Sequence, residues 1–314
     1  MLADAIRSLQ AESERHTSAG ALASVTGGYR VVGFAAMSIF VVDEDRCNRC
    51  GDCVSDCPAR IIALGDDGPA TIPAEKQQYC IRCQHCLAIC AQAAVTLDGH
   101  RPEDSRPLLA QALPSLDQID LLVRGRRSVR RYQHENVEPS LIERLLEATA
   151  CAPTGVNARE LTFAVVRDRA VLDVLRKRVL STLADALEAG RLVERNASFA
   201  ASVIRADADG RDLIFRGAPH LLIVSAPPST PCPQQDVPLA LATFDLLAQS
   251  AGLGTVWCGY VRRAFDALPE LKDLFGLPRD HVYYPMLFGY PAVRYARTVE
   301  RKGSAVVRRV DSFA

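Results

Sequence analysis

Cys47-Asn48-Arg49-Cys50-Gly51-Asp52-Cys53-Val54-Ser55-Asp56-Cys57-Pro58 is followed 33 residues later by Cys80-Ile81-Arg82-Cys83-Gln84-His85-Cys86-Leu87-Ala88-Ile89-Cys90. Both stretches have the spacing Cys-x2-Cys-x2-Cys-x3-Cys. The same offset relates Ile39 to Ile72 and Leu64 to Leu97, so the similarity extends beyond the cysteines. These two stretches therefore indicate an internal duplication.

The spacing is typical of the bacterial two-cluster ferredoxin, in which three thiolates of each run hold one [4Fe–4S] cluster and the fourth ligates the other. We therefore assign Cys47, Cys50, Cys53 and Cys90 to a first cluster, and Cys80, Cys83, Cys86 and Cys57 to a second. Ala91 stands where the second run would normally carry proline. That change affects the stiffness of the turn rather than the ligation.

Structural zinc and disulfides are the competing interpretations of these cysteines. Zinc sites use two Cys-x2-4-Cys pairs separated by a longer loop, not a triple followed by a fourth cysteine. Disulfides require an oxidising compartment, whereas the chain has an odd total of 11 cysteines and no convincing export signal. We therefore expect a cytoplasmic iron–sulfur protein.

Length and composition predict a globular protein with more than one domain. The chain has 314 residues, of which 48% are hydrophobic and 24% charged, and its formal net charge is zero. That balance argues against a nucleic-acid partner recognised through the whole surface. The longest apolar stretch, Val31 to Val42, is too short to span a bilayer.

We expect a helical N-terminal extension over 1–36, a ferredoxin-type domain over 37–100, a Pro-rich linker over 101–114 and a second domain over 115–314.

The second domain has a mixed pattern of helices and strands. Ser115 with Gln118 has the form of a capping box and predicts the start of a helix. Apolar periodicity predicts further helices at about 139–151, 168–189, 236–251 and 262–275, and strands at 161–167, 221–226, 255–260 and 282–288. The expected fold class is α+β.

A basic turn, Arg126-Arg127-Ser128-Val129-Arg130-Arg131-Tyr132, follows the first of these helices. The chain lacks both G-x-G-x-x-G after a predicted strand and G-x-x-x-x-G-K-[ST], which disfavours a Rossmann dinucleotide site and a nucleotide triphosphatase. The turn also lacks the aromatic platform of a nucleic-acid site. Arginine forks with a serine hydroxyl suit a phosphate or a polyol chain.

Four further segments, together with this turn, resemble the FMN-dependent nitroreductase family, and with the cysteine runs they resemble its ferredoxin-fused branch over roughly residues 38–310. The segments are Ala152-Pro153-Thr154-Gly155-Val156-Asn157, Arg216-Gly217-Ala218-Pro219, Gly252-Leu253-Gly254-Thr255-Val256-Trp257-Cys258-Gly259, and Phe288-Gly289-Tyr290-Pro291 followed by Arg297 and Arg301-Lys302. Taken singly, Gly254 and Gly259 also fit strand ends, and Cys151, Cys232 and Cys258 fit small buried side chains.

The resemblance implies a mainly antiparallel sheet wrapped by helices, a homodimer, and FMN at the interface. It assigns the flavin phosphate, ribityl chain and pyrimidine edge to Arg126, Arg127, Ser128 and Arg130. It assigns the lining of the flavin ring, from the partner chain, to Pro153, Thr154 and Asn157. The backbone N–H groups near flavin N5 and O4 would come from Cys258 and Gly259. A further contact to the phosphate would come from Arg297. No catalytic side chain is expected, since the chemistry belongs to flavin N5.

The expected function is an oxidoreductase that passes electrons from two [4Fe–4S] clusters to FMN and on to a small organic acceptor, such as a nitroaromatic, a quinone or an activated alkene. The expected electron donor is a low-potential ferredoxin-like protein, with NAD(P)H slower or inactive. The alternative function is an electron-relay subunit that docks to a larger redox complex without turning over a small molecule. An oxygen-registering redox sensor is a third hypothesis, disfavoured because no DNA-binding element is visible.

Overall fold

The computed structural model describes residues 38–311, so the predicted extension over 1–36 lies outside the described residues. The described chain separates into two compact units, and the division falls between Pro107 and Leu108, inside the predicted linker. Among the described helices, none combines the length and the apolar character that crossing a bilayer requires.

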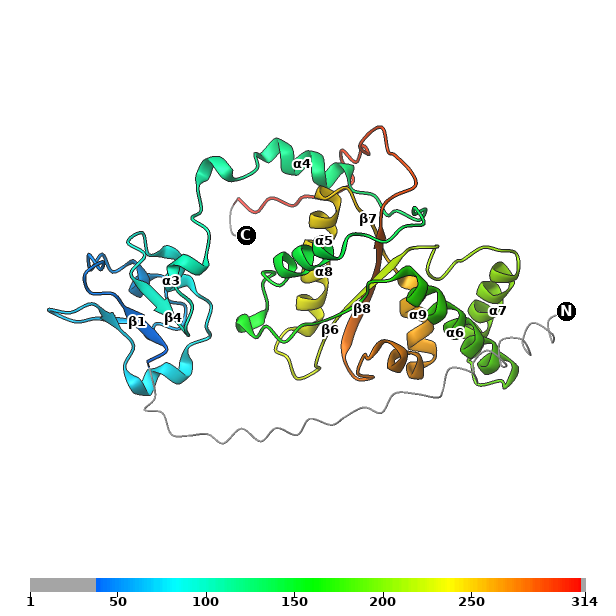
Figure 1. Ribbon diagram of the computed structural model, residues 1–314, viewed down its shortest axis with the longest axis horizontal. Helices are drawn as coiled ribbons and strands as arrows, with labels where there is room; N and C mark the ends of the chain where they lie inside the picture. Colours follow the sequence, from blue (N-terminus) through cyan, green and yellow to red (C-terminus); the bar gives the residue numbers. More distant parts are fainter. Residues whose placement is uncertain (1–37, 312–314) are drawn as a thin grey trace. The chain divides into compact units, whose positions relative to one another are not determined.

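The first unit is built from two short antiparallel strand pairs and two short helices (blue to cyan in Figure 1). The pairs are β1 (Phe40–Val42) with β4 (Val95–Leu97), and β2 (Ala63–Leu64) with β3 (Ala70–Thr71). The helices are α2 (Asp52–Ser55) and α3 (His85–Ile89), accompanied by the 3-10 turns η2 (Ala74–Tyr79) and η3 (Pro102–Asp104). Its core is a small apolar cluster that includes Phe40, Ile62, Ile72, Leu87 and Leu97.

The second unit is centred on a four-stranded antiparallel sheet with the order β5-β6-β8-β7. The strands are β5 (Thr162–Val166), β6 (His220–Ala226), β7 (Gly254–Trp257) and β8 (Val282–Gly289). Every residue of β6 is buried, because helices cover both faces of the sheet. This confirms the predicted α+β class with an antiparallel sheet.

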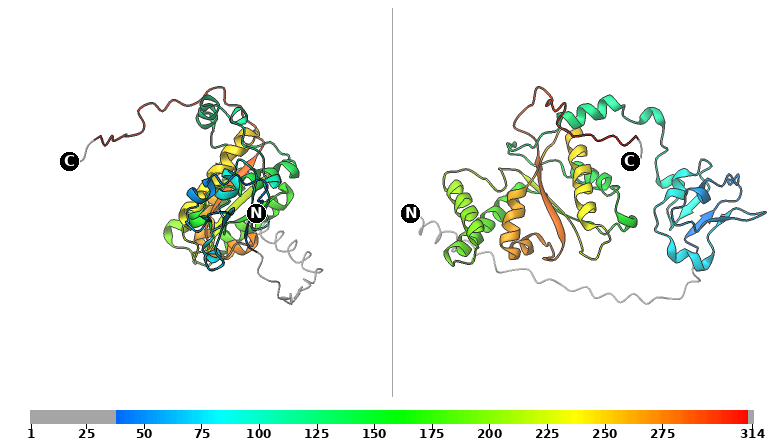
Figure 2. Two further views of the ribbon diagram at one scale, coloured as in Figure 1. Left: turned by 90° about the vertical axis from the view of Figure 1, so that its left-hand side faces the viewer. Right: turned by 180° about the vertical axis from the view of Figure 1, so that it is seen from behind.

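The two faces of the sheet pack against different helices, as alternate residues of β6 show. Leu221 and Ile223 belong to the core under α6 (Arg169–Glu188), α7 (Glu194–Ala208) and α9 (Gly259–Ala267). Leu222 and Val224 belong to the core under α5 (Pro139–Thr149) and α8 (Pro233–Ser250). Figures 1 and 2 show these two helix groups on opposite sides of the strands.

Helix starts agree with the capping signals in the sequence. Helix α4 (Leu116–Gly125) begins at the predicted capping box, in which the Gln118 N–H donates to Ser115 Oγ at 3.3 Å and the Ser115 N–H donates to Gln118 Oε1 at 2.8 Å. At α6, the Asp168 side chain provides a simple N-cap by accepting from the Ala170 N–H at 2.8 Å.

Two predicted elements differ from the structure, and one helix was missed. The helix expected over 262–275 is divided into α9 and the 3-10 helix η6 (Pro269–Phe275), because proline disfavours a helical residue before it and Leu268 is extended at φ −135°. The strand expected over 255–260 ends at Trp257, since α9 begins at Gly259. Helix α7 was not predicted, although its buried Phe199, Ala200, Val203 and Ala206 have helical spacing.

Candidate functional site

The eight cysteines of the first unit border two cavities, four to each. One open cavity is bordered by Cys47, Cys50, Cys53 and Cys90. The other is bordered by Cys57, Cys80, Cys83 and Cys86. The fold thus brings together the two sets that the crossover spacing predicts, with the fourth cysteine of each run facing the cavity of the other run.

The duplication is repeated in the backbone that shapes these cavities. Left-handed conformations recur at the same offset, with φ of 58° at Arg49 and 51° at Arg82, and 81° at Gly51 and 60° at Gln84. The turn after each fourth cysteine closes in the same way, since Arg60 N donates to Cys57 O and Ala93 N to Cys90 O, both at 3.0 Å. Ala91 therefore does not change the hydrogen bonding of the turn that Pro58 occupies in the first run.

The thiols within each set influence one another. Burial raises the pKa of Cys53, and the neighbouring thiols of Cys50, Cys90 and Cys47 raise it further. Burial likewise raises the pKa of Cys86 to about 12. Among residues 38–311, no group of three or more His, Cys, Asp or Glu side chains is arranged to hold a single metal ion. The thiols surround cavities, which suits a multi-atom cluster better than one ion.

In the second unit, the basic turn is fixed against the edge strand β7. The Val129 N–H donates to Thr255 O at 2.8 Å, and Ser128 forms a parallel bridge with Thr255. A Cβ at Gly254 would lie 2.5 Å from Val129 Cγ2, so only glycine permits this approach. The packing therefore holds Ser128 beside the strand that leads to Cys258 and Gly259.

Asp245 on α8 supports the same turn from within the protein. It is only 4% exposed, and its carboxylate pairs with Arg126 Nη1 at 3.4 Å. It also accepts hydrogen bonds from Thr255 Oγ1 and, at 3.2 Å, from Trp257 Nε1. A buried carboxylate needs such partners because removal of its charge from water is costly. Asp245 therefore fixes the position of Arg126, which the resemblance places at the flavin.

The two other arginines of the turn are placed differently. Arg127 is half-buried, and its Nε has no hydrogen-bond partner within the described chain. Buried polar groups without a partner are rare in folded proteins and call for an explanation. Arg130 is exposed, and its Nη1 donates to Ser128 O at 3.3 Å. Arg127 and Arg130 therefore remain available to an anionic group.

The loop at Pro153 is attached to the opposite end of α8. The Gly155 N–H donates to Asp236 Oδ1 at 2.9 Å, while the other carboxylate oxygen of Asp236 is buried without a partner in the described residues. Thr154 Oγ1 accepts from the Arg159 N–H at 3.1 Å. Asn157 has a left-handed conformation at φ 56°, and Pro153 is exposed. This tight loop presents its predicted flavin contacts at the surface.

Within one chain, the basic turn and the Pro153 loop are not brought together by α8. Their anchors, Asp245 and Asp236, are nine residues apart on this helix, which corresponds to about 13 Å along the axis at a rise of 1.5 Å per residue. Nine residues at 3.6 per turn also place the two anchors on opposite sides of the helix. Helix α8 therefore fixes the basic turn and the Pro153 loop at two points about 13 Å apart on opposite sides of the helix.

The segment from β7 into α9 carries the last predicted backbone donors. The Cys258 N–H, which the resemblance assigns to the flavin, instead donates to Pro285 O at 2.9 Å. Its thiol donates to Ile214 O at 3.2 Å, and burial raises its pKa to about 11. Gly259 is exposed at the first position of α9, where an N–H has no intrahelical acceptor. Gly259 is thus the better candidate donor.

Arg297 lies on the exposed segment after β8, where it forms no hydrogen bond or ion pair with any residue in 38–311. No sequence motif identified Asp236 or Asp245 as residues of the site. A signal was present, because they are the only charged residues in the stretch that forms α8. Charge in an otherwise uncharged helix indicates either an exposed face or a buried polar contact.

Two family models match the chain in the order of its two units. The model described as a 4Fe-4S dicluster domain matches residues 39–91, and the model described as the Nitroreductase family matches residues 123–290. The second match covers more than half of the chain and contains the basic turn, the Pro153 loop and Gly259.

Curated relatives match the second unit. A putative NADH dehydrogenase/NAD(P)H nitroreductase of Archaeoglobus fulgidus is 30% identical over 171 residues, which cover 54% of this chain and 83% of the relative. A protein of the same description from Methanothermobacter thermautotrophicus is 28% identical over 180 residues, which cover 56% of this chain and 80% of the relative.

A solved nitroreductase with bound FMN from Bacteroides fragilis shares the fold of the second unit. It is 22% identical with a TM-score of 0.50, and the match covers 61% of this chain and 99% of that one.

Proposed function

Because the chain belongs to the nitroreductase family of FMN-dependent oxidoreductases and carries an N-terminal 4Fe-4S dicluster domain, we propose that it passes electrons from two [4Fe–4S] clusters to FMN and on to a small organic acceptor. The observation that carries this proposal is the division of the eight cysteines into two sets of four around two cavities. A chain with one cluster or none would not need the crossover of Cys57 and Cys90.

The residues of the second unit fit FMN. The unpartnered Nε of Arg127 and the exposed guanidinium of Arg130 can donate to phosphate or to the flavin pyrimidine edge. Arg126, held by Asp245, keeps the turn in place and adds positive charge. When bound, FMN supplies redox chemistry that accepts electrons singly from clusters and delivers them in pairs.

Further residues of the second unit would orient the bound FMN. The Ser128 hydroxyl can contact the ribityl chain, and the Gly259 N–H would serve the N5 and O4 region from the start of α9. Arg297 remains a proposed phosphate contact. No acid or base side chain is assigned, so the chain contributes binding, orientation and electrostatics rather than a proton donor.

We place the flavin site at the interface of a homodimer. The separation of Asp236 from Asp245 along α8 supports this, because the helix anchors the Pro153 loop and the basic turn at different points and on opposite sides. Pro153, Thr154 and Asn157 of a second copy would line the flavin ring. Light scattering of the FMN-loaded protein tests this, and a monomer that retains FMN would refute it.

The donor is proposed to be a low-potential ferredoxin-like protein in the cytoplasm, with NAD(P)H slower or inactive. Several relatives have descriptions that include NAD(P)H, so the nicotinamide route is the main competitor. The acceptor is proposed to be a nitroaromatic, a quinone, an activated alkene or a halogenated aromatic. Faster reoxidation of the reduced protein by a protein partner than by these compounds would favour the electron-relay alternative.

The proposal is tested by the iron and FMN content of the protein and by the rate of flavin reduction. Anaerobically purified protein is expected to contain close to eight iron atoms and one FMN per chain, because eight thiolates fit two clusters. Cys83→Ser should impair the second cluster and slow reduction of the flavin by reduced ferredoxin in stopped-flow measurements, while FMN stays bound.

Iron near four atoms per chain, or bound zinc, would contradict the two-cluster assignment. Flavin reduction by ferredoxin at an unchanged rate in Cys83→Ser would show that the second cluster is not on the route to the flavin. Rapid flavin bleaching by NADH in a protein stripped of both clusters would show that the ferredoxin domain is not the entrance for electrons.

A further inference from the structure

The two cysteine cavities have the same ligand set and nearly the same backbone, so differences between them come from the side chains around them. At the offset of 33 residues, Arg46 corresponds to Tyr79 and Ala94 corresponds to Ile61. Reduction potentials of iron–sulfur clusters depend on net charge, on hydrogen bonds to the sulfurs and on solvent exposure. The duplication therefore provides a comparison within one molecule.

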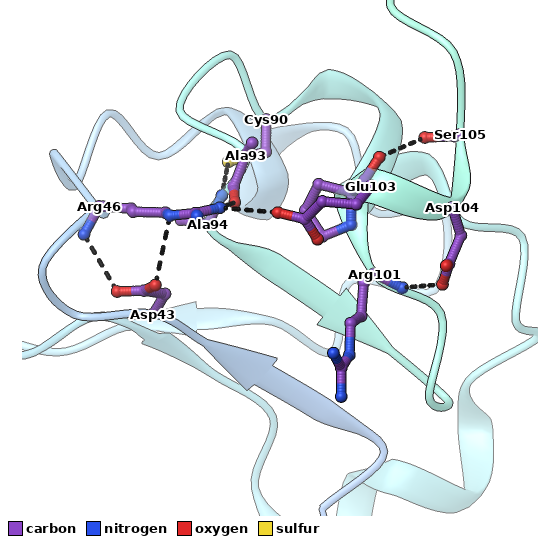
Figure 3. A network of polar contacts seen from close by, with 10 residues as sticks. Asp43, Arg46, Cys90, Ala93, Ala94, Arg101, Glu103, Asp104 and Ser105 are labelled. Carbon is purple, nitrogen blue, oxygen red and sulfur yellow. Dashed lines mark hydrogen bonds and ion pairs between the residues drawn. The ribbon is translucent and has the colours of Figure 1, made fainter.

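The first cavity has a hydrogen bond to a ligand sulfur for which the second has no counterpart. The Ala94 N–H donates to Cys90 Sγ at 3.3 Å (Figure 3). Between the equivalent Ile61 N–H and Cys57 Sγ, both inside the described part of the chain, no hydrogen bond is formed. A donor aimed at the sulfur stabilises the more negative, reduced state of a cluster and thus raises its potential.

Arg46 holds the peptide unit that makes this hydrogen bond. Arg46 Nη1 donates to Ala93 O at 3.0 Å, and that carbonyl belongs to the same peptide unit as the Ala94 N–H (Figure 3). Hydrogen bonds in a chain polarise one another, so donation to the carbonyl strengthens the N–H as a donor. The next peptide unit is fixed as well, since the Asp43 N–H donates to Ala94 O at 2.8 Å.

The position of the guanidinium is set by two carboxylates. Arg46 Nε pairs with Asp43 Oδ2 at 3.4 Å, and Nη1 pairs with Glu103 Oε1 at 3.1 Å. Their negative charge opposes reduction of a cluster, but both side chains are about half exposed or more and are screened by water. The direct contact to sulfur is not screened in this way. Tyr79, at the position equivalent to Arg46, is 62% exposed and has no cationic donor.

The surroundings of the two cavities differ in the same direction. The first cavity is bordered by Asn48, Arg49, Asp52 and Gln92 as well as by the apolar Val42, Leu64, Ala70 and Val95, whereas the second is bordered mainly by large aliphatic side chains (Ile61, Ile62, Ile72, Ile81 and Leu97) together with His85. An apolar environment disfavours added charge, which lowers the potential of the cluster within it.

We propose that Arg46 is a positioning residue that holds the Ala93–Ala94 peptide against Cys90 Sγ and keeps the first cluster at a higher potential than the second. This inference rests on the two-cluster assignment of the proposed function. When the reduction potentials are measured by titration with dithionite, each cluster takes up one electron from dithionite, and no bond in the protein is formed or broken. An electron shared between the two clusters would then reside mainly on the first.

The experiment is an anaerobic redox titration of the full chain followed by electron paramagnetic resonance. In Arg46→Met, the midpoint potential of the first cluster should become more negative. The expected shift is up to about 59 mV, which corresponds to a tenfold change in the equilibrium constant of a one-electron reduction. The second midpoint should stay in place. Cys83→Ser identifies the two signals, because it impairs only the second cluster.

Arg82→Met is the matched control. Arg82 also directly precedes a ligand cysteine and is ion-paired, with Asp98 at 2.8 Å, but within residues 38–311 it has no hydrogen bond to a peptide that donates to sulfur. Its replacement should leave both midpoints nearly unchanged. Equal shifts of the midpoint potentials in Arg46→Met and Arg82→Met would show that only the loss of charge matters, and this would overturn the proposal. Unchanged midpoint potentials in Arg46→Met would also overturn it.

The unsubstituted chain provides a second test if Arg46→Met does not assemble its clusters. Its first cluster should have the higher midpoint, and equal midpoints or the opposite order would overturn the proposal. Iron analysis separates this failure from failure of the proposed function, since eight iron atoms with the wrong order of midpoints would leave the two-cluster assignment intact.

Discussion

Asp245 and Arg126 form an ion pair in which the carboxylate is almost fully buried and the guanidinium is about one quarter exposed, with Oδ2 3.4 Å from Nη1. The pair joins α8 to the basic turn. Because Asp245 also binds Thr255 and Trp257, one side chain connects the turn, the helix and the edge strand β7.

Asp245→Asn is expected to destabilise the second unit and to weaken FMN retention. Breaking a buried pair leaves its partner uncompensated, and since Arg126 is partly exposed we expect a loss of about 2 to 3 kcal/mol in the free energy of unfolding. Urea unfolding and FMN fluorescence titration measure the two effects. Asp120→Asn, which breaks the exposed pair with Arg124 on α4, is the control and should change neither quantity measurably.

Arg127→Met is expected to weaken FMN binding without lowering the stability of the FMN-free protein. Methionine removes the buried Nε that lacks a partner, so the FMN-free state loses no hydrogen bond at that atom. A charge-assisted contact to a bound anion contributes about 1.5 to 3 kcal/mol, which corresponds to roughly tenfold or more in the dissociation constant. The same two titrations apply. Arg131→Met, an exposed position in the same turn, should retain FMN.

Arg130→Ala is expected to reduce FMN retention while the iron content stays the same. The side chain is exposed, and its hydrogen bond within the described chain is to Ser128 O of the same turn, so its removal costs little stability. Size-exclusion chromatography followed by flavin and iron analysis checks this. Unchanged flavin content would mean that Arg130 is only a solvated part of the turn.

Gly155→Ala is expected to displace the Pro153 loop. A Cβ at this position would lie 2.7 Å from both Cβ and Sγ of Cys232, and the Gly155 N–H would move away from Asp236. FMN affinity and melting temperature should both fall. Gly125→Ala is the matched control, since a Cβ at Gly125 meets nothing within 4 Å, and alanine is favoured over glycine in a helix.

Cys258 is expected to resist alkylation at pH 8, whereas the exposed Cys151 should react. Burial raises the pKa of Cys258 to about 11, so its thiol stays protonated, and the thiolate is the reactive form. As pH rises from about 9 to 11, the unfolded thiol ionises before the folded one, so the free energy of unfolding should fall over that range. Peptide mass mapping after iodoacetamide treatment measures the labelling, and modification of Cys258 in the native protein at pH 8 would contradict this.

Local signals predicted much of the second unit. The capping box at Ser115 and the apolar periodicity of α5, α6 and α8 depend on neighbours within a few residues, so the sequence contains them directly. The division at Leu268 was missed although Pro269 signalled it, because the apolar periodicity continues across the proline. The boundaries between the expected domains and the roles of the individual flavin residues remain predictions.

The sequence by itself determined the chemistry of the cysteines, since ligand type and the spacing x2-x2-x3 are properties of one short segment. It also determined the order of the family segments and the offset of 33 residues. Only the tertiary structure decided which side chains support those segments. Asp245 meets Arg126, Asp236 meets Gly155, and Arg46 holds the peptide beside Cys90. Such contacts join residues that are distant in sequence, and they form only after the sheet and helices have packed, which no local pattern specifies.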